Sequence, residues 1–172
     1  MKLLTVLSIL ALAATVRAET TLTMTGLHNC CGSCAKGITK AGMSVGDDVT
    51  IDVPEKSSTV TITTKKKGDA KKVAEAIIAA GYFGRFEGDA YEAKPSTAAA
   101  KPEAKLTKAT VSGVHLCCKG CANAATDAVK AVAGVTAYNI VAKETSFTVE
   151  GEFAKADLNA ALNAAGFAGD IK

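Results

Sequence analysis

The chain of 172 residues contains no tryptophan, only five phenylalanines and three tyrosines, and only three prolines. A core with so few aromatic side chains has to be packed mainly with Val, Ile, Leu and Ala. Cysteine and histidine are also scarce, with six and two residues. Because these two residue types carry most metal and redox chemistry, their placement along the chain is the most informative feature of the sequence.

All the cysteines and both histidines lie in two short stretches that repeat one pattern. Residues 26–34 have the sequence GLHNCCGSC, and residues 113–121 have the sequence GVHLCCKGC, 87 positions later (113 minus 26). Both follow the pattern G-φ-H-x-C-C-x-x-C, in which φ is apolar. A repeat of this kind in a chain of this length predicts two small domains, each with a small core.

An excess of charge of one sign is lacking as well. The chain has 20 Lys and Arg against 17 Asp and Glu, a formal charge of +3. Residues 19–91 carry nine basic and nine acidic side chains, and residues 107–172 carry six of each. Neither domain is therefore expected to bind nucleic acid through its charge.

Residues 1–18 have the pattern of a secretory signal peptide. Lys2 precedes an apolar run, and Val16 and Ala18 place small or apolar residues at positions −3 and −1 of a cleavage site. The alternative, a transmembrane anchor, would need a longer apolar run. We therefore expect cleavage before Glu19, a secreted or periplasmic protein, and no stable insertion in a membrane afterwards.

The cysteines of an exported chain commonly form structural disulfides. Here two clusters of three cannot join distant loops unless they pair with each other, and each cluster would leave one thiol over. Thiolates are also soft ligands that bind Cu(I), Zn(II) and similar thiophilic ions. We therefore favour metal binding, with structural disulfides as the alternative.

Each half of the chain has the periodicity of four strands and two helices. Alternating apolar residues indicate strands, and apolar residues three and four apart indicate helices. The expected strands are 20–26, 48–53, 58–64 and 82–86, then 108–112, 136–141, 145–149 and 167–171. The expected helices are 34–41 and 70–80, then 121–132 and 153–165. Each half therefore has the order β-α-β-β-α-β.

The stretch between the halves cannot build a core. Residues 92–106 contain Pro95 and Pro102 among alanines and charged residues, a composition typical of a flexible linker. We therefore expect one domain at 19–91 and a second at 107–172.

The β-α-β-β-α-β order, with a C-x-x-C sequence between the first strand and the first helix, resembles the heavy-metal-associated domain. This module occurs in copper chaperones, copper-transporting ATPases and periplasmic mercury-binding proteins. The resemblance covers nearly all of 20–89 and 107–172. It rests on Cys31-Gly32-Ser33-Cys34 with the helix behind it, and on Gly81-Tyr82 and Gly166-Phe167 after the second helices.

The resemblance implies an α+β fold, with two ferredoxin-like βαββαβ sandwich domains joined by the linker. It also implies a protein that is not an enzyme and that binds a heavy-metal ion, most of all Cu(I), with Zn(II) or Hg(II) as alternatives. Such a protein traffics, buffers or detoxifies the metal. Its partner would be a metal-transporting membrane protein or another metal acceptor.

Two groups of residues are candidate ligands. The principal candidates are the C-x-x-C cysteines, which the N-terminus of the following helix would favour as thiolates: Cys31, Cys34, Cys118 and Cys121. The family pattern is G-M-T-C-x-x-C, so two residues are inserted here and four candidates are additions to it: Cys30, Cys117, His28 and His115.

The added residues have two interpretations. Cys30 and Cys117 could be third ligands that tune the site or thiols buried under the loop, and the histidines could be ligands or could hydrogen-bond the loop. Tyr82 and Phe167 are expected in the cores. Because the two loops match, we expect two ions per chain, bound independently by the two domains.

Two other functions stay open. The first is a thiol–disulfide oxidoreductase that uses C-x-x-C, although no proline stands in the later strands, where a thioredoxin-like site would need one. The second is an interaction module that has kept the fold without binding metal.

Overall fold

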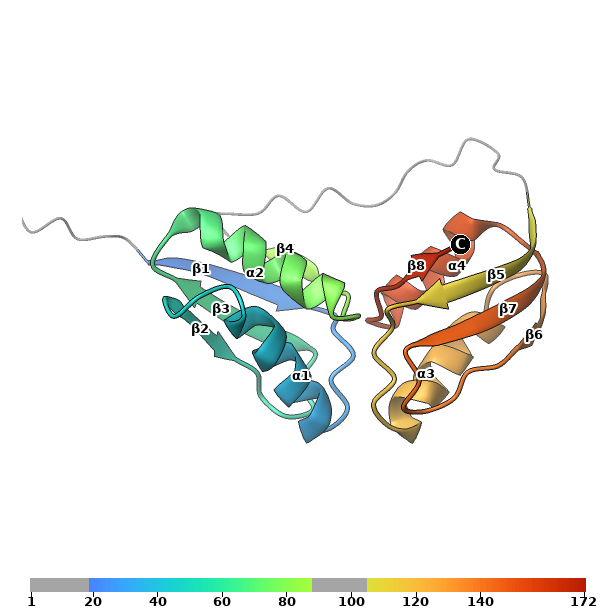
Figure 1. The fold of residues 1–172 in the computed structure, drawn as a ribbon, viewed down its shortest axis with the longest axis horizontal. Helices are drawn as coiled ribbons and strands as arrows, with labels where there is room; N and C mark the ends of the chain where they lie inside the picture. Colours follow the sequence, from blue (N-terminus) through green and yellow to red (C-terminus); the bar gives the residue numbers. More distant parts are fainter. Residues whose placement is uncertain (1–18, 88–104) are drawn as a thin grey trace, which may run out of the picture.

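The computed structural model describes residues 19–87 and 105–172, so the expected signal peptide and nearly all of the expected linker lie outside the described residues. The described chain forms two domains that lie side by side (Figure 1). Within these ranges, no helix combines the length and the apolar character needed to cross a membrane.

The first domain contains one sheet and two helices. Its elements are β1 (Thr20–Thr25), α1 (Gly32–Met43), β2 (Val49–Asp52), β3 (Thr59–Thr64), α2 (Lys67–Ala79) and β4 (Arg85–Glu87). The strand order is β2-β3-β1-β4, and every neighbouring pair is antiparallel. This is the arrangement of a ferredoxin-like sandwich.

The second domain repeats this arrangement. Its elements are β5 (Leu106–Ser112), α3 (Lys119–Lys130), β6 (Val135–Tyr138), β7 (Ser146–Phe153), α4 (Lys155–Ala164) and β8 (Asp170–Ile171). The strand order is β6-β7-β5-β8, again antiparallel throughout. The predicted fold class and the order of elements in both halves are confirmed.

Some element boundaries differ from the prediction. α1 begins at Gly32 instead of residue 34, with Cys31 in extended conformation at its N-cap. α4 begins at Lys155 instead of residue 153, because Phe153 is still part of β7 and pairs with Leu106 of β5. Leu106, the last residue of the predicted linker, therefore belongs to the sheet.

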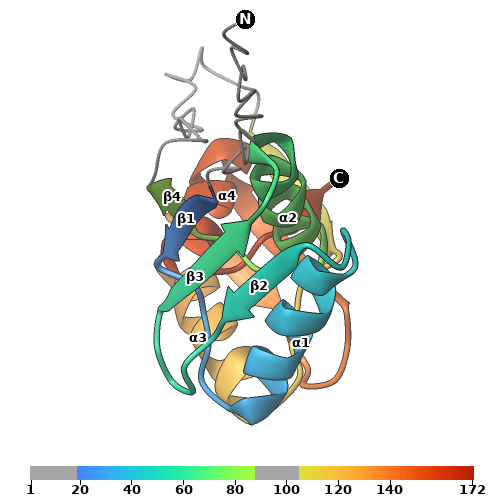
Figure 2. The same cartoon turned by 90° about the vertical axis from the view of Figure 1, so that its left-hand side faces the viewer.

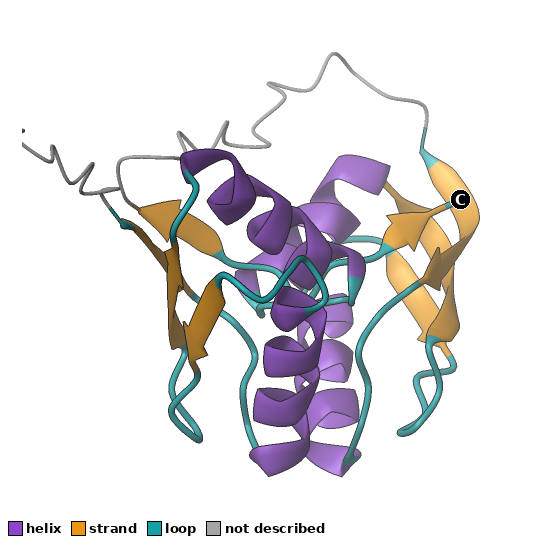
Figure 3. Ribbon diagram, turned by 60° about the vertical axis from the view of Figure 1, so that its left-hand side comes forward, coloured by secondary structure: helices purple, strands orange, loops and turns teal. Residues whose placement is uncertain are grey.

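The cores lie between the sheet and the helices of each domain. Side chains on the helix-facing side of each sheet alternate with partly exposed ones, as the period of two in the sequence predicts. In Figure 3 the helices occupy the middle of the view and the two sheets lie on its outer sides. The fully buried residues include Leu22, Ile38, Ile62 and Ile77 in the first domain and Val111, Val129, Val149 and Leu158 in the second.

The two domains pack against each other, which corrects the expectation that they are independent. The loops after α2 and α4 meet in an antiparallel bridge between Tyr82 and Phe167. The Phe83 N–H donates to the carbonyl of Gly166, and the Ala168 N–H donates to that of Gly81, each at 3.0 Å. Figure 2 looks from the end of the first domain and shows the second domain directly behind it.

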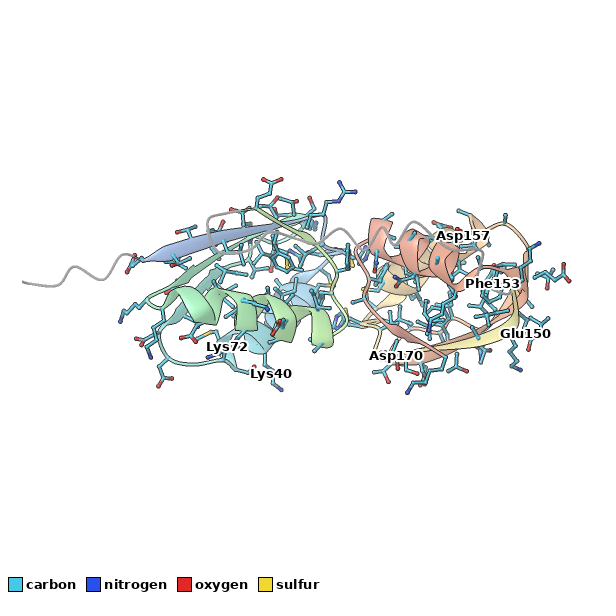
Figure 4. All side chains as sticks on the ribbon, turned by 90° about the horizontal axis from the view of Figure 1, so that it is seen from above. Lys40, Lys72, Glu150, Phe153, Asp157 and Asp170 are labelled. Atoms are coloured by element: carbon cyan, nitrogen blue, oxygen red, sulfur yellow. The ribbon has the colours of Figure 1, made fainter. Side chains whose placement is uncertain are left out.

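Ion pairs take no part in this contact. Among the described residues, each ion pair lies within a single domain. Lys72 of the first domain and Glu150 of the second, for example, lie on opposite sides of the view in Figure 4. Lys72 pairs with Asp69, and Glu150 pairs with Lys108. The junction is held by backbone hydrogen bonds and by the residues of the cysteine loops.

Candidate metal centre

Backbone geometry positions each cysteine loop. The loops leave their strands at Gly26 and Gly113, whose φ angles of +80° and +76° suit glycine. The backbone N–H groups of Leu27 and Val114 then donate to carbonyls in the hairpin connections of their own domains, each at 3.1 Å. In the first domain, the side chain of Asn29 donates to two further carbonyls there, at 2.9 and 3.1 Å. Both loops are thus held against their sheets.

The C-x-x-C cysteines surround the start of a helix in each domain. Cys31 and Cys118 are the N-caps of α1 and α3, and Cys34 and Cys121 lie in the first turns with no exposed surface. The first N–H groups of a helix lack backbone partners and give its end a partial positive charge. The helix N-terminus therefore favours the thiolate form in both pairs, and contacts with the neighbouring sulfurs decide which thiol keeps its proton.

The two loops face each other across the junction and bring all six sulfurs into one cluster. Sγ of Cys34 lies 3.6 Å from Sγ of Cys121, 3.5 Å from that of Cys117 and 3.8 Å from that of Cys30. Sγ of Cys121 lies 3.7 Å from that of Cys30 and 3.6 Å from that of Cys117. The outer distances are 3.8 Å for Cys31–Cys34, 3.7 Å for Cys118–Cys121, 3.9 Å for Cys31–Cys117 and 3.6 Å for Cys30–Cys118.

These separations match metal thiolates and not disulfides. All six cysteines are free thiols, and a disulfide would require sulfurs about 2.0 Å apart. Thiolates bound to a metal at about 2.3 Å lie about 3.8 Å apart around a tetrahedral ion and about 4.0 Å apart around a trigonal one. The cluster could therefore take up thiophilic ions with small movements.

Burial and mutual hydrogen bonding set the thiol pKa values. A hydrogen bond from Cys121 holds the pKa of Cys34 far below its usual range, and the same contact, with burial, raises the pKa of Cys121. Burial is the main cause that raises the pKa of Cys30 to about 12, and it also raises that of Cys117. The N–H of Cys121 lowers the pKa of Cys118 to about 7. Thiol and thiolate therefore coexist in the metal-free cluster.

The histidines lie beside the sulfurs and pack against aromatic rings of the opposite domain. The His28 ring lies 4.6 Å from the ring of Phe167, and the His115 ring lies 4.3 Å from that of Tyr82. Nε2 of each histidine is buried, with no hydrogen-bond partner among the described residues. A ring nitrogen of His28 also lies within 4.8 Å of the sulfurs of Cys30 and Cys121. At least His28 therefore borders the sulfur cluster directly. Burial lowers the pKa of His28.

Tyr82 and Phe167 are buried, as predicted, but they also build the junction. The Tyr82 hydroxyl donates to the carbonyl of Cys34 at 3.3 Å and so supports the first turn of α1. Gly37 makes room for it, because a Cβ atom there would collide with the hydroxyl. In the sequence Gly37 is merely a weak position within a helix, and nothing local reveals this role.

Gly81 and Gly166 were also missed as contributors to the site. A Cβ atom on Gly81 would lie 2.5 Å from backbone atoms of Gly113 and His115, and one on Gly166 would collide with the backbone N of His28. Both have positive φ angles, +91° and +83°. Their place after the second helices suggests only helix ends, so the close approach to the opposite cysteine loop was not predictable.

All eight predicted ligands lie at the junction, and the structure brings them together in one place instead of two. Cys30 and Cys117 were predicted as additions to two separate C-x-x-C sites. In the structure each lies against cysteines of the opposite domain, Cys30 beside Cys118 and Cys121, and Cys117 beside Cys31 and Cys34. The added cysteines therefore connect the two C-x-x-C pairs.

Comparison with known proteins identifies a family match within the second domain. Residues 110–168 match the profile of the heavy-metal-associated domain. No curated protein sequence matches the chain with significance. A solved structure, the N-terminal soluble domains of Bacillus subtilis CopA, aligns over 91% of this chain and 96% of that chain, with 16% identity and a TM-score of 0.33.

Proposed function

Since residues 110–168 belong to the heavy-metal-associated domain family, we propose that this protein binds thiophilic metal, with Cu(I) as its cargo, at the cysteine cluster between its domains. We also propose that residues 19–87 are a second copy of this domain, because they have the same order of elements, the same strand order and the same cysteine loop. The protein then acts by holding metal and not by catalysis.

One observation carries the proposal: six free thiols lie together with neighbouring sulfurs 3.5–3.9 Å apart. Crowding buried thiols in this way has no evident structural benefit, whereas it provides a ready set of soft ligands. Thiolate-rich sites favour Cu(I), and imidazole suits Zn(II) and Cu(II) as well. The excess of sulfur over imidazole in this cluster favours Cu(I), with Zn(II) and Hg(II) as competitors.

The proposed place of action is outside the cytoplasm, as a secreted or periplasmic protein. This rests on the sequence of residues 1–18, which lie outside the described part of the chain. Sequencing the N-terminus of the mature protein should give Glu19. In that compartment the protein would carry or buffer copper and pass it to a transporter or another metal acceptor.

The direct test is anaerobic purification followed by metal analysis and by competition with a chromophoric Cu(I) chelator. We expect bound Cu(I) that survives the competition. Cys34→Ser combined with Cys121→Ser should abolish tight binding, because it removes the two fully buried sulfurs of the cluster and breaks both C-x-x-C pairs. Oxidising the thiols should do the same, and reduction should restore binding, because only thiolates bind the soft ion.

The same preparation also separates the two alternatives. Catalysed reduction of insulin without metal uptake would point to a thiol–disulfide oxidoreductase. A reduced protein that neither binds Cu(I) nor reduces insulin would be an interaction module, and the proposed function would be wrong.

A further inference from the structure

The six sulfurs of the cluster have a regular arrangement. Nine sulfur pairs are 3.5–3.9 Å apart. Three more pairs lie within 4.8 Å: Cys30–Cys31, Cys31–Cys118 and Cys117–Cys118. Six points joined by these twelve edges have the connectivity of an octahedron. The remaining pairs are then opposite corners: Cys30 and Cys117, Cys31 and Cys121, Cys34 and Cys118.

An octahedron of sulfurs has a definite capacity for trigonal ions. Four alternate faces use each corner twice, so each thiolate would bridge two ions and each ion would have three sulfurs. The number of metal–sulfur bonds is the same from both sides: six sulfurs with two bonds each make twelve bonds, and four ions with three bonds each also make twelve. One such set of faces is Cys30–Cys31–Cys118, Cys31–Cys34–Cys117, Cys117–Cys118–Cys121 and Cys30–Cys34–Cys121.

Charge favours filling four faces over filling two. Six thiolates carry six negative charges in a site whose cysteines are buried or half-buried. Two Cu(I) ions would leave a net charge of −4 in a partly buried site, and four would leave −2. An uncompensated buried charge is costly, and the N-termini of α1 and α3 add only about half a positive charge each.

We infer that the six cysteines form one tetranuclear Cu(I)–thiolate cluster shared by both domains, in place of one mononuclear site per domain. The inference rests on the proposed function and specifies its stoichiometry and its ligands. Each Cu(I) displaces the remaining protons from its thiols, so no electrons are transferred and no disulfide forms. Cys30 and Cys117 are bridging ligands in this cluster, because each lies against the C-x-x-C sulfurs of the other domain.

The test is anaerobic titration of the reduced full-length protein with Cu(I), followed by native mass spectrometry of the monomer. We expect the metal-free chain to convert to a species with four Cu(I) ions with little accumulation of intermediates, because bridging couples the ions. X-ray absorption should show three sulfurs per copper and a short copper–copper scattering path.

The decisive variant combines Cys30→Ser with Cys117→Ser and leaves both C-x-x-C pairs intact. It should hold at most two Cu(I) ions per monomer and lose the copper–copper path. Lys119→Ala, an exposed position beside Cys118, is the matched control and should still bind four. Circular dichroism of all three proteins checks that the fold is unchanged.

Saturation of the unaltered protein at two Cu(I) ions without a copper–copper path would overturn the shared cluster but leave copper binding in place. A Cys30/Cys117 variant that still takes up four ions cooperatively would also overturn it. Absence of any Cu(I) uptake by the unaltered protein would instead overturn the proposed function itself.

Discussion

At the scale of single residues, the two domains differ at the aromatic residue after the second helix and at one position of the first helix. In the first domain, Gly37 of α1 leaves room for the hydroxyl of Tyr82. In the second domain, the corresponding helix position is Ala124, and the corresponding aromatic residue is Phe167, which has no hydroxyl. The glycine and the tyrosine therefore form a matched pair, and the second domain has neither of them.

This pairing predicts a compensating double substitution. Gly37→Ala alone should destabilise the protein by about 1–3 kcal/mol, the usual cost of overpacking a core, because its Cβ would meet the Tyr82 hydroxyl. Adding Tyr82→Phe should recover most of the loss, since it removes the hydroxyl that the new Cβ would meet and gives the residue types of the second domain. Chemical denaturation of the four proteins of the cycle measures the coupling, and strictly additive effects would contradict the pairing.

The thiol pKa values predict that copper binding depends on pH. Burial raises the pKa values of Cys30 and Cys117, and the hydrogen bond with Cys34 raises that of Cys121, so these thiols are protonated at pH 7. Copper has to displace their protons, so loading should release at least three protons per chain, and affinity should fall as pH falls. Calorimetry in buffers of different ionisation enthalpy measures the release, and proton-neutral loading would show that the thiols are already ionised.

At the scale of elements, the loops after α2 and α4 hold the cluster together. Each presents a glycine with positive φ to the cysteine loop of the other domain, and each places an aromatic ring against the opposite histidine. The bridge between Tyr82 and Phe167 joins the two loops. The site therefore depends on loops that carry none of its ligands.

Gly166→Ala should separate the domains without unfolding them. The new Cβ would collide with the backbone N of His28 across the junction, and the positive φ adds a cost of roughly 1–2 kcal/mol. Small-angle X-ray scattering should show a more extended molecule, and the capacity for Cu(I) should fall. Gly26→Ala is the control, because its φ of +80° is similar but its Cβ would meet no atom within 4 Å. An equal effect of both substitutions would mean that backbone strain alone is responsible.

At the scale of the whole molecule, the ligands of one cluster come from two domains, each with its own sheet and pair of helices. The contact between the domains lies mainly at the loops around the cluster and the side chains buried there, and the described residues form no ion pair across it. We therefore expect the unfolding of the metal-free domains to be coupled only weakly. Copper bound to sulfurs of both domains would add that coupling. A ligand that binds only the folded state stabilises it by about 2.7 kcal/mol at a hundred times its dissociation constant.

Calorimetry under anaerobic conditions should therefore show two unfolding transitions without copper and one transition with it. The midpoint should rise by about 10 °C or more, since 1 kcal/mol corresponds to about 4–8 °C for a domain of this size. The Cys30→Ser and Cys117→Ser variant provides the comparison, because each domain keeps its own C-x-x-C pair. If copper stabilises the two domains of this variant as strongly and as jointly as in the unaltered protein, the cluster does not couple them.

The fold of each half follows from local features of the sequence. Alternating residues such as Leu22 and Met24 have to face a core, and periodic residues such as Val73 and Ile77 have to face the sheet, so element order could be read directly. The position of Cys31 and Cys34 around a helix start was predictable for the same reason. Helix ends were less predictable, because residues such as Gly32 and Phe153 join an element through contacts beyond its own pattern.

The joining of the two cysteine loops was decided by the tertiary structure alone. Residues 87 positions apart become neighbours only because Gly81 and Gly166 allow close backbone approach and the aromatic rings pack against the opposite histidines. Such contacts depend on the surfaces of two folded domains. The periodicity of residues within one helix or strand carries no information about them. The sequence therefore predicted two sets of thiols, and the docking of the domains made them one.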